Sequence, residues 1–134
     1  MSKLQKLIIL SLLMMICFVG NLQAQSSTIT RLSPKEFQQK MAASDGFYLL
    51  DIRTAFEFSS SRIEDATHVS FLTPIAFSRR TRDLDKDAPI FVYDQTGHRS
   101  TMAVNRLRKM GFREIYELEG GFKAWTNKKF PTDE

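Results

Sequence analysis

The stretch Pro89–Met110 constrains what this chain can fold into more than any other. Residues Ile90–Tyr93 form a short run of β-branched and aromatic side chains, which predicts a buried strand. Polar residues 94–100 follow, and apolar side chains then recur at helical spacing over 103–110. A strand, a tight loop and a helix bring several backbone N–H groups together at the helix N-terminus. The sequence therefore predicts an anion-binding loop in this stretch.

The loop carries a distinctive pattern, because residues 94–100 read Asp94-Gln95-Thr96-Gly97-His98-Arg99-Ser100. This order resembles the active-site loop of rhodanese-like sulfurtransferase domains, which follows the pattern Cys-x-x-Gly-x-Arg-Ser. Every fixed position matches except the first, where Asp94 replaces the cysteine. In the family that cysteine is the nucleophile, and it holds a sulfane sulfur as a persulfide. The resemblance therefore implies a sulfurtransferase scaffold without its nucleophile.

Two further segments are similar to the same family. The first contains an Asp-x-Arg signature followed by Glu-Phe, although Ser61, Arg62 and Asp65 stand where the family usually has Gly, His and Gly. We expect a locally altered turn there rather than a different fold. The second is a C-terminal Gly-Gly-x-x-x-Trp signature. The resemblance covers about residues 33–131 and implies structural roles for the signature residues Asp51, Arg53, Glu57, Gly120, Gly121 and Trp125.

The order of the remaining elements predicts the fold class. The almost wholly apolar run 47–52 reads as a strand, as do the segments 67–70 and 112–118, and capped helical segments begin near Ser33, Thr54 and Thr73. Strands that alternate with helices indicate βαβ units and a parallel sheet. Four strands follow from the pattern, and the resemblance adds a fifth at 28–32. We expect one α/β domain of the rhodanese-like type, with about five parallel strands and helices on both faces.

The N-terminal segment predicts export. Lys3 and Lys6 precede a short apolar run that ends in small residues near Ala24, which is typical of a secretory signal peptide. The run is shorter than the roughly 20 residues that span a bilayer, so an uncleaved anchor is the weaker alternative. We therefore expect a signal peptide at 1–24, a lead-in at 25–32, the domain at 33–131 and a tail at 132–134. The mature protein would be periplasmic or secreted and would contact a membrane only through the transient signal peptide.

Cleavage after Ala24 has a chemical consequence, because Cys17 is the only cysteine in the chain. The mature protein would contain neither a thiol nor a disulfide. Loss of Lys3 and Lys6 lowers the formal net charge from +4 to +2, so the basic balance gives no argument for nucleic-acid binding. We expect no cofactor and no metal ion.

The chemistry of Asp94 decides the functional hypothesis. Sulfur transfer requires a polarizable thiolate, whereas a carboxylate is a hard, weak nucleophile toward sulfur. A carboxylate does suit the loop as a resident anion that accepts N–H groups of the turn and charge from Arg99. The leading hypothesis is a non-catalytic binding or regulatory module that uses the 94–100 loop, with an unknown protein partner or a small anion as ligand.

Several alternatives stay open at this point. The chain could act as a sulfurtransferase through a partner thiol or an unrecognised residue, or it could have no ligand at this face. A phosphoryl-acceptor role for Asp94 is disfavoured, because Thr96 supplies no second carboxylate for Mg²⁺. His98 could serve as a base beside Asp94, but we expect it to face solvent, and we expect His68 to be structural.

Overall fold

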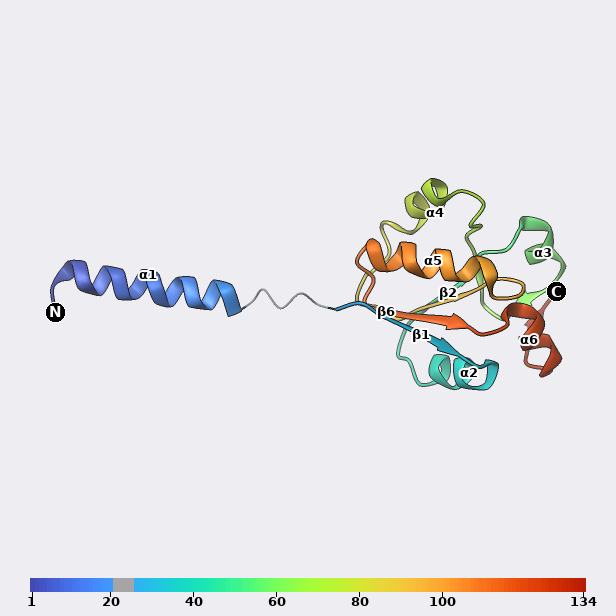
Figure 1. Ribbon diagram of the computed structural model, residues 1–134. Coiled ribbons are helices and arrows are strands. Elements are labelled where there is room, and N and C mark those ends of the chain that lie inside the picture. Colours follow the sequence, from blue (N-terminus) through green and yellow to red (C-terminus); the bar gives the residue numbers. More distant parts are fainter. Residues whose placement is uncertain (21–25) are drawn as a thin grey trace.

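A five-stranded sheet with the strand order β1-β6-β5-β2-β4 forms the centre of the molecule (Figure 1). The computed structural model describes residues 1–20 and 26–134. All neighbouring strands of the sheet pair in parallel, which confirms the predicted α/β class and strand number. The strands are β1 (Thr28–Leu32), β2 (Tyr48–Asp51), β4 (Thr67–His68), β5 (Ile90–Tyr93) and β6 (Glu114–Leu118).

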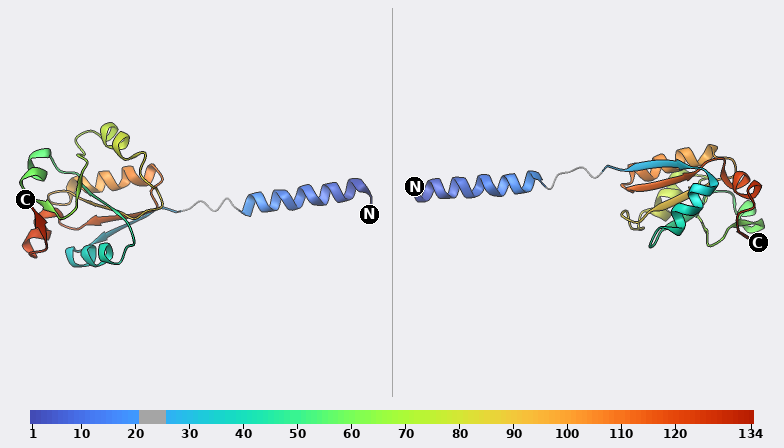
Figure 2. Two further views of the ribbon diagram at one scale, coloured as in Figure 1. Left: turned by 180° about the vertical axis from the view of Figure 1, so that it is seen from behind. Right: turned by 90° about the horizontal axis from the view of Figure 1, so that it is seen from below.

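Helices cover both faces of this sheet (Figures 1 and 2). Helices α4 (Pro74–Thr81) and α5 (His98–Lys109) lie on one face, and α2 (Pro34–Ala42) and α6 (Gly121–Asn127) lie on the other. The short helix α3 (Ala55–Ser60) lies near the carboxyl ends of the strands.

The two cores follow from the alternation of side chains along each strand. In β5, Ile90 and Val92 pack with α4 and α5, whereas Phe91 and Tyr93 pack with α2 and α6. All four side chains are fully buried. A strand that is apolar on both faces is typical of a parallel sheet covered by helices on both sides. Burying each such side chain contributes about 1.5–3 kcal/mol, so β5 is anchored firmly just before the loop that follows it.

Strands lie on both sides of the segment 33–131 that is expected to form the domain. The expected lead-in contains β1, which pairs with β6 and forms one edge of the sheet. The expected tail contains β7 (Thr132–Asp133), which pairs antiparallel with β3 (Arg62–Ile63). Both strands are partly exposed, so their sequences lack the apolar run that identifies a central strand. The folded domain of this chain therefore includes β1 and β7.

The N-terminal helix α1 (Lys3–Gly20) lies apart from the sheet (Figure 1). Its large apolar side chains are exposed as far as they are described, up to Met15. Among the helices in the described ranges, none combines the length and the apolar character required to span a bilayer. The expected cleavage site after Ala24 falls outside the described residues.

Helix α3 begins with a capping box that links it to the loop after β5. The Thr54 side chain accepts the backbone N–H of Glu57, and the Glu57 carboxylate accepts the backbone N–H of Thr54 at 2.9 Å. A guanidinium nitrogen of Arg99 lies 3.5 Å from the same carboxylate. Burial raises the pKa of Glu57, but the hydrogen bonds from Thr54 and the charge of Arg99 outweigh it, so the net pKa is lowered.

Helix α6 holds the backbone of the β5–α5 loop from the opposite side. The N–H of Phe122 donates to the carbonyl of Asp94 at 2.8 Å, and the N–H of Lys123 donates to the carbonyl of Gln95 at 3.1 Å. This close approach requires Gly121, whose φ is +63°. A Cβ at Gly121 would lie 2.6 Å from the Asp94 carbonyl oxygen. Gly121 therefore allows α6 to approach the loop this closely.

The first prediction concerns this contact. Gly121→Ala should lower the free energy of unfolding by roughly 3 kcal/mol or more, because it adds a clash with the loop backbone to the strain of a left-handed residue. Gly111→Ala is the matched control, since φ is +96° there but nothing lies within 4 Å of the added Cβ. The control should lower the free energy of unfolding by only about 1–2 kcal/mol. Urea unfolding of the two variants measures the difference, and equal losses would contradict the proposed contact.

The second prediction concerns pH. The folded-state pKa of Glu57 is lowered from 4.5. The ionised carboxylate therefore stabilises the folded state above pH 4.5, and this stabilisation is lost as the pH falls through the folded-state pKa. Glu57→Gln should therefore destabilise the protein by less than about 1 kcal/mol at neutral pH, and the difference from the parent should vanish in acid. Unfolding curves across acidic pH test this. Glu64→Gln, which removes an exposed carboxylate, is the control and should leave the free energy of unfolding at neutral pH within about 0.5 kcal/mol of the parent.

Candidate functional site

The loop between β5 and α5 lies at the carboxyl edge of the parallel sheet, where ligands of such sheets usually bind. Asp94 follows the last residue of β5 directly, and α5 begins at His98. Gly97 precedes α5 with a φ of +95°, a conformation that suits glycine. The chain therefore reverses within four residues, and the first turn of α5 faces back toward the end of β5.

The carboxylate of Asp94 lies where the backbone amides of this loop converge. Its Oδ1 accepts the N–H of Gly97 at 2.5 Å, and its Oδ2 accepts the N–H of Arg99 at 2.6 Å and that of Ser100 at 3.2 Å. Asp94 is only 1% exposed. These are charge-assisted bonds to the N-terminal amides of a helix, which have no partner within the helix. The side chain thus acts as a resident anion in the anion site of the loop.

The side chain of Arg99 differs from the sequence-based expectation. Its guanidinium was expected to supply charge to Asp94, but it pairs with Glu57 instead. The reason is geometric, because the backbone N–H of Arg99 already points at Asp94 and its half-buried side chain extends toward α3. Arg99 therefore joins the loop to α3.

The other loop residues divide into buried and exposed groups. Ser100 is buried, and its hydroxyl donates to Glu117 Oε1 at 2.7 Å. Gln95 accepts a hydrogen bond from Arg53 at 3.1 Å. Thr96 and His98 are exposed, and Thr96 Oγ1 lies 3.0 Å from His98 Nδ1. His98 therefore faces solvent, and its ring contacts Thr96 rather than Asp94.

The Asp-x-Arg signature forms a buried ion pair beside the loop. The guanidinium of Arg53 approaches both carboxylate oxygens of Asp51, the closest at 2.7 Å, and both side chains are almost fully buried. Arg53 also donates to the Ser61 carbonyl at 2.6 Å and lies 4.1 Å from the centroid of the Phe122 ring. Gln95 is a further partner of Arg53, at Nη1, so all three guanidinium nitrogens donate at least one hydrogen bond. The pair therefore ties β2, the loop and α6 together.

The burial of this pair also affects Tyr93. Desolvation raises the pKa of the Tyr93 hydroxyl, and the neighbouring Asp51 carboxylate raises it further. Tyr93 therefore stays neutral, and its oxygen accepts the backbone N–H of Ile63 at 3.1 Å. His68 supports the same region, because its Nε2 lies 2.8 Å from the Arg53 carbonyl and its ring stacks on Phe58.

The sequence analysis missed one polar cluster beneath the loop. Glu117 is buried in β6, and it accepts hydrogen bonds from Ser100, Thr101 and Arg31. The hydrogen bond and charge of Glu117 raise the pKa of Arg31. The sequence did contain a signal for this cluster, because Glu117 lies between the apolar residues of β6 and a buried carboxylate requires polar partners. This cluster fixes the first turn of α5 against β6 and β1.

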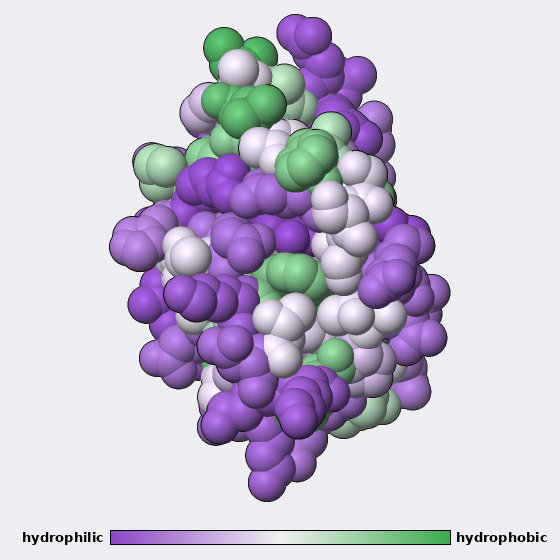
Figure 3. Space-filling view, turned by 90° about the vertical axis from the view of Figure 1, so that its right-hand side faces the viewer, coloured by the Kyte–Doolittle hydropathy of each residue, from purple (hydrophilic) through white to green (hydrophobic). Residues whose placement is uncertain are grey.

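A shallow cavity of about 290 Å³ opens next to the loop. Figure 3 faces the carboxyl edge of the sheet and shows a mostly hydrophilic surface with a small apolar area near its centre. Asp94 does not line this cavity, because its carboxylate is covered by the loop. Phe56 stands at the rim with 80% of its surface exposed. The lining residues are Arg53, Phe56, Glu57, Ser60, Ser61, Gln95 and Phe122.

Within residues 1–20 and 26–134, no three His, Cys, Asp or Glu side chains are grouped so that they could hold an ion.

Known proteins share this architecture. The rhodanese-like domain family matches residues 33–128 of the chain. The thiosulfate sulfurtransferase GlpE of Glaesserella parasuis is 30% identical over 106 residues, which cover 79% of this chain and 94% of that protein. The putative sulfur carrier protein YrkF of Bacillus subtilis is 27% identical over 104 residues, and the match covers 77% of this chain but only 54% of that protein.

Solved structures agree with these matches. The rhodanese-like domain of the Alr3790 protein from Anabaena, solved by NMR, gives a TM-score of 0.67 at 26% identity, over 77% of each chain. A rhodanese-related protein from Thermoplasma volcanium, at 22% identity, shows the same fold with a TM-score of 0.66 over 77% of this chain and 96% of that one. The match to the family covers most of the chain, and the fold agrees with it. This chain therefore belongs to the rhodanese-like domain family.

Proposed function

We propose that this chain is an exported, non-catalytic rhodanese-like module that binds a protein partner through the face around loop 94–100. One observation carries the proposal: the Asp94 carboxylate accepts three backbone N–H groups and fills the point on which the loop amides converge. A sulfurtransferase needs that point for a reactive sulfur. In the proposal, Asp94 takes the position of the family's nucleophilic cysteine.

The chemistry of the matched region supports an inactive site. Residues 33–128 contain no cysteine, and the one cysteine of the chain is Cys17 in the N-terminal segment. Persulfide chemistry requires a thiolate that attacks sulfur and holds it in a stable S–S bond. The carboxylate of Asp94 forms no comparably stable bond to sulfur. The relatives named as sulfurtransferases thus share the scaffold, whereas the proposed chemistry of this chain differs.

The pairing of the charged side chains favours a protein over a small anion as ligand. A small anion would have to displace Asp94 from the loop amides and compete with Asp51 for Arg53 and with Glu57 for Arg99. A protein partner needs no such exchange, because it can bind the rim of the loop. Exposed Phe56 and His98 provide an apolar anchor and polar contacts there. The loop is already ordered by its own hydrogen bonds, which lowers the entropic cost of binding.

Sulfur transfer through a partner's thiol is the second candidate. It rests on the names of the relatives, which include thiosulfate sulfurtransferases, and on the retained scaffold of the loop. In that case the loop would position a persulfide that another protein carries. Activity of the chain in the presence of a small thiol, with Asp94 intact, would favour this candidate.

The third prediction tests the inactive loop. Asp94→Cys should give thiosulfate:cyanide sulfurtransferase activity, because the loop amides that now bind the carboxylate would then stabilise a cysteine thiolate. The parent should show no activity above the uncatalysed rate. A gain of about tenfold or more over the parent would indicate an intact scaffold that lacks only the nucleophile. Thiocyanate formation and the mass of one added sulfur atom on the protein are the two readouts.

Asp94→Ser is the control for this experiment, since it removes the carboxylate without adding a thiol. It should stay inactive, and circular dichroism should verify that both variants fold. Turnover by the parent without an added thiol would contradict the proposal outright. An inactive but folded Asp94→Cys variant would show that the loop has lost more than its nucleophile.

The fourth prediction tests export. We propose that the signal peptide is removed after Ala24, so the mature chain should begin at Gln25 and contain no cysteine. Expression of the full chain in a Gram-negative host should place the mature protein outside the cytoplasm, where mass spectrometry gives its N-terminus. A maleimide should then fail to label it. Ala24→Arg should block processing and leave Cys17 in the product. Retention of Cys17 in the unaltered exported protein would contradict the cleavage.

A further inference from the structure

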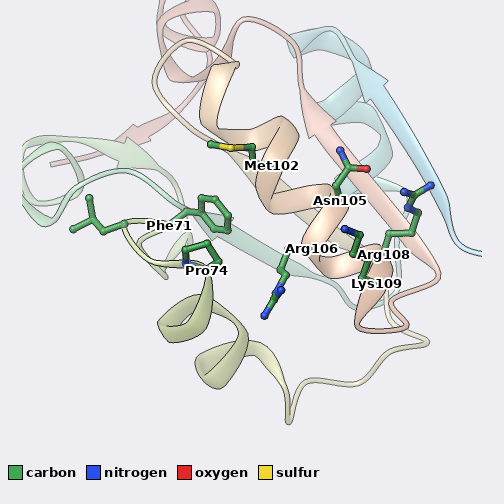
Figure 4. Close-up of a pocket in the computed structure, with 8 residues that line it drawn as sticks. Phe71, Pro74, Met102, Asn105, Arg106, Arg108 and Lys109 are labelled. Atoms are coloured by element: carbon green, nitrogen blue, oxygen red, sulfur yellow. The ribbon is translucent and has the colours of Figure 1, made fainter.

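A hollow of about 530 Å³ lies between α5 and the segment that precedes α4, away from loop 94–100 (Figure 4). Phe71 borders it on one side, and Met102 and Arg106 project from α5 on the other. Leu72 also lines it. Lys109 lies at the end of α5 beside it. We call these five residues and the space between them the α4–α5 groove. Its volume falls in the range that holds bulky side chains of a ligand.

The apolar side chains of the groove are unusually exposed. Leu72 is 72% exposed and Met102 is 59% exposed, and neighbouring Ile75 is 68% exposed. None of the three belongs to either hydrophobic core of the domain. Phe71, in contrast, is buried in the core and forms the floor. The exposed side chains therefore contribute little to folding, and apolar groups gathered around a hollow indicate a binding surface.

The rim of the groove is positively charged. Arg106, Arg108 and Lys109 line it, whereas Arg79 and Arg80 lie in the last turn of α4 and outside the lining. Basic side chains complement the dipole at the carboxyl ends of helices, which accounts for part of this arrangement. The dipole does not account for the exposed apolar side chains beside them. Within the described part of the chain, none of these five basic residues forms a salt bridge, and no acidic residue lines the groove.

We propose that the α4–α5 groove binds an acidic peptide segment of a protein partner. One bulky apolar side chain of the segment occupies the hollow against Phe71, Leu72 and Met102, and its carboxylates pair with the basic rim. Charge complementarity selects this occupant, because the rim offers only positive charge. The concave shape favours a peptide with a protruding side chain over a flat membrane surface. This surface shares no residue with loop 94–100, so the inference goes beyond the proposed function.

The experiment uses two synthetic peptides and the purified full-length chain. One peptide has a central phenylalanine flanked by glutamates, and the other has lysine in place of every glutamate. Fluorescence anisotropy should show binding of the acidic peptide only, and added salt should weaken it through screening. Met102→Glu and Lys109→Glu should each weaken binding by about tenfold, the effect expected of a residue at the centre of a small interface. Both side chains are exposed, so the fold should tolerate these changes.

Lys35→Glu is the matched control, since it makes the same change of charge on α2, across the sheet from the groove. It should leave the affinity within about twofold of the parent, as a distant charge is largely screened. Equal binding of the two peptides, no binding of either, or an equal effect of Lys35→Glu would overturn the proposal. Two other outcomes would overturn it as well: preferential binding to phosphatidylglycerol vesicles, and self-association of the chain that Met102→Glu abolishes.

Discussion

Backbone amides that point at one spot leave their hydrogen-bonding capacity unused unless an acceptor lies among them. In this protein the acceptor is the carboxylate of Asp94, which takes the N–H groups of Gly97, Arg99 and Ser100. These groups belong to the tight turn and to the first turn of α5, so a single side chain fixes how the helix leaves the strand. The position of α5 against the sheet depends on this interaction, and so does the surface that the loop presents.

The carboxylate is stable there only because its surroundings are built around it. A buried charge is costly unless hydrogen bonds compensate it, and each oxygen of Asp94 has at least one N–H donor. Gly121 lets α6 approach the same loop, and the buried Asp51–Arg53 pair braces it through Gln95. Gly121 and the Asp-x-Arg signature therefore support the same loop, although they lie far apart in the sequence.

The features that could be predicted from the sequence are those determined by residues close together in the chain. The strand, loop and helix of 90–109 follow from a short apolar run, a polar turn and a helical period, all within one continuous stretch. The pairing of β7 with β3 and the cluster at Glu117 depend on residues distant in sequence, for which periodicity gives no register. Arg99 was assigned to Asp94 because the two are neighbours, but the fold brings Glu57 within reach of its side chain. Sequence thus predicted the backbone of the site better than its ion pairs.

The Asp94 side chain occupies the point on which the loop amides converge, and this affects which function the loop can serve. A catalytic loop must leave such a focus available to the group that reacts, and this usually costs stability, because the donors are unpaired until substrate arrives. Here a side chain of the protein itself pairs the donors, and Asp94, which supplies that carboxylate, is only 1% exposed. Compared with a catalytic loop whose amides stay free, this loop is held by its own hydrogen bonds, and a substrate cannot reach the amides. A rigid surface with satisfied polar groups favours recognition by a partner at its rim, which is why the proposed function is binding rather than catalysis.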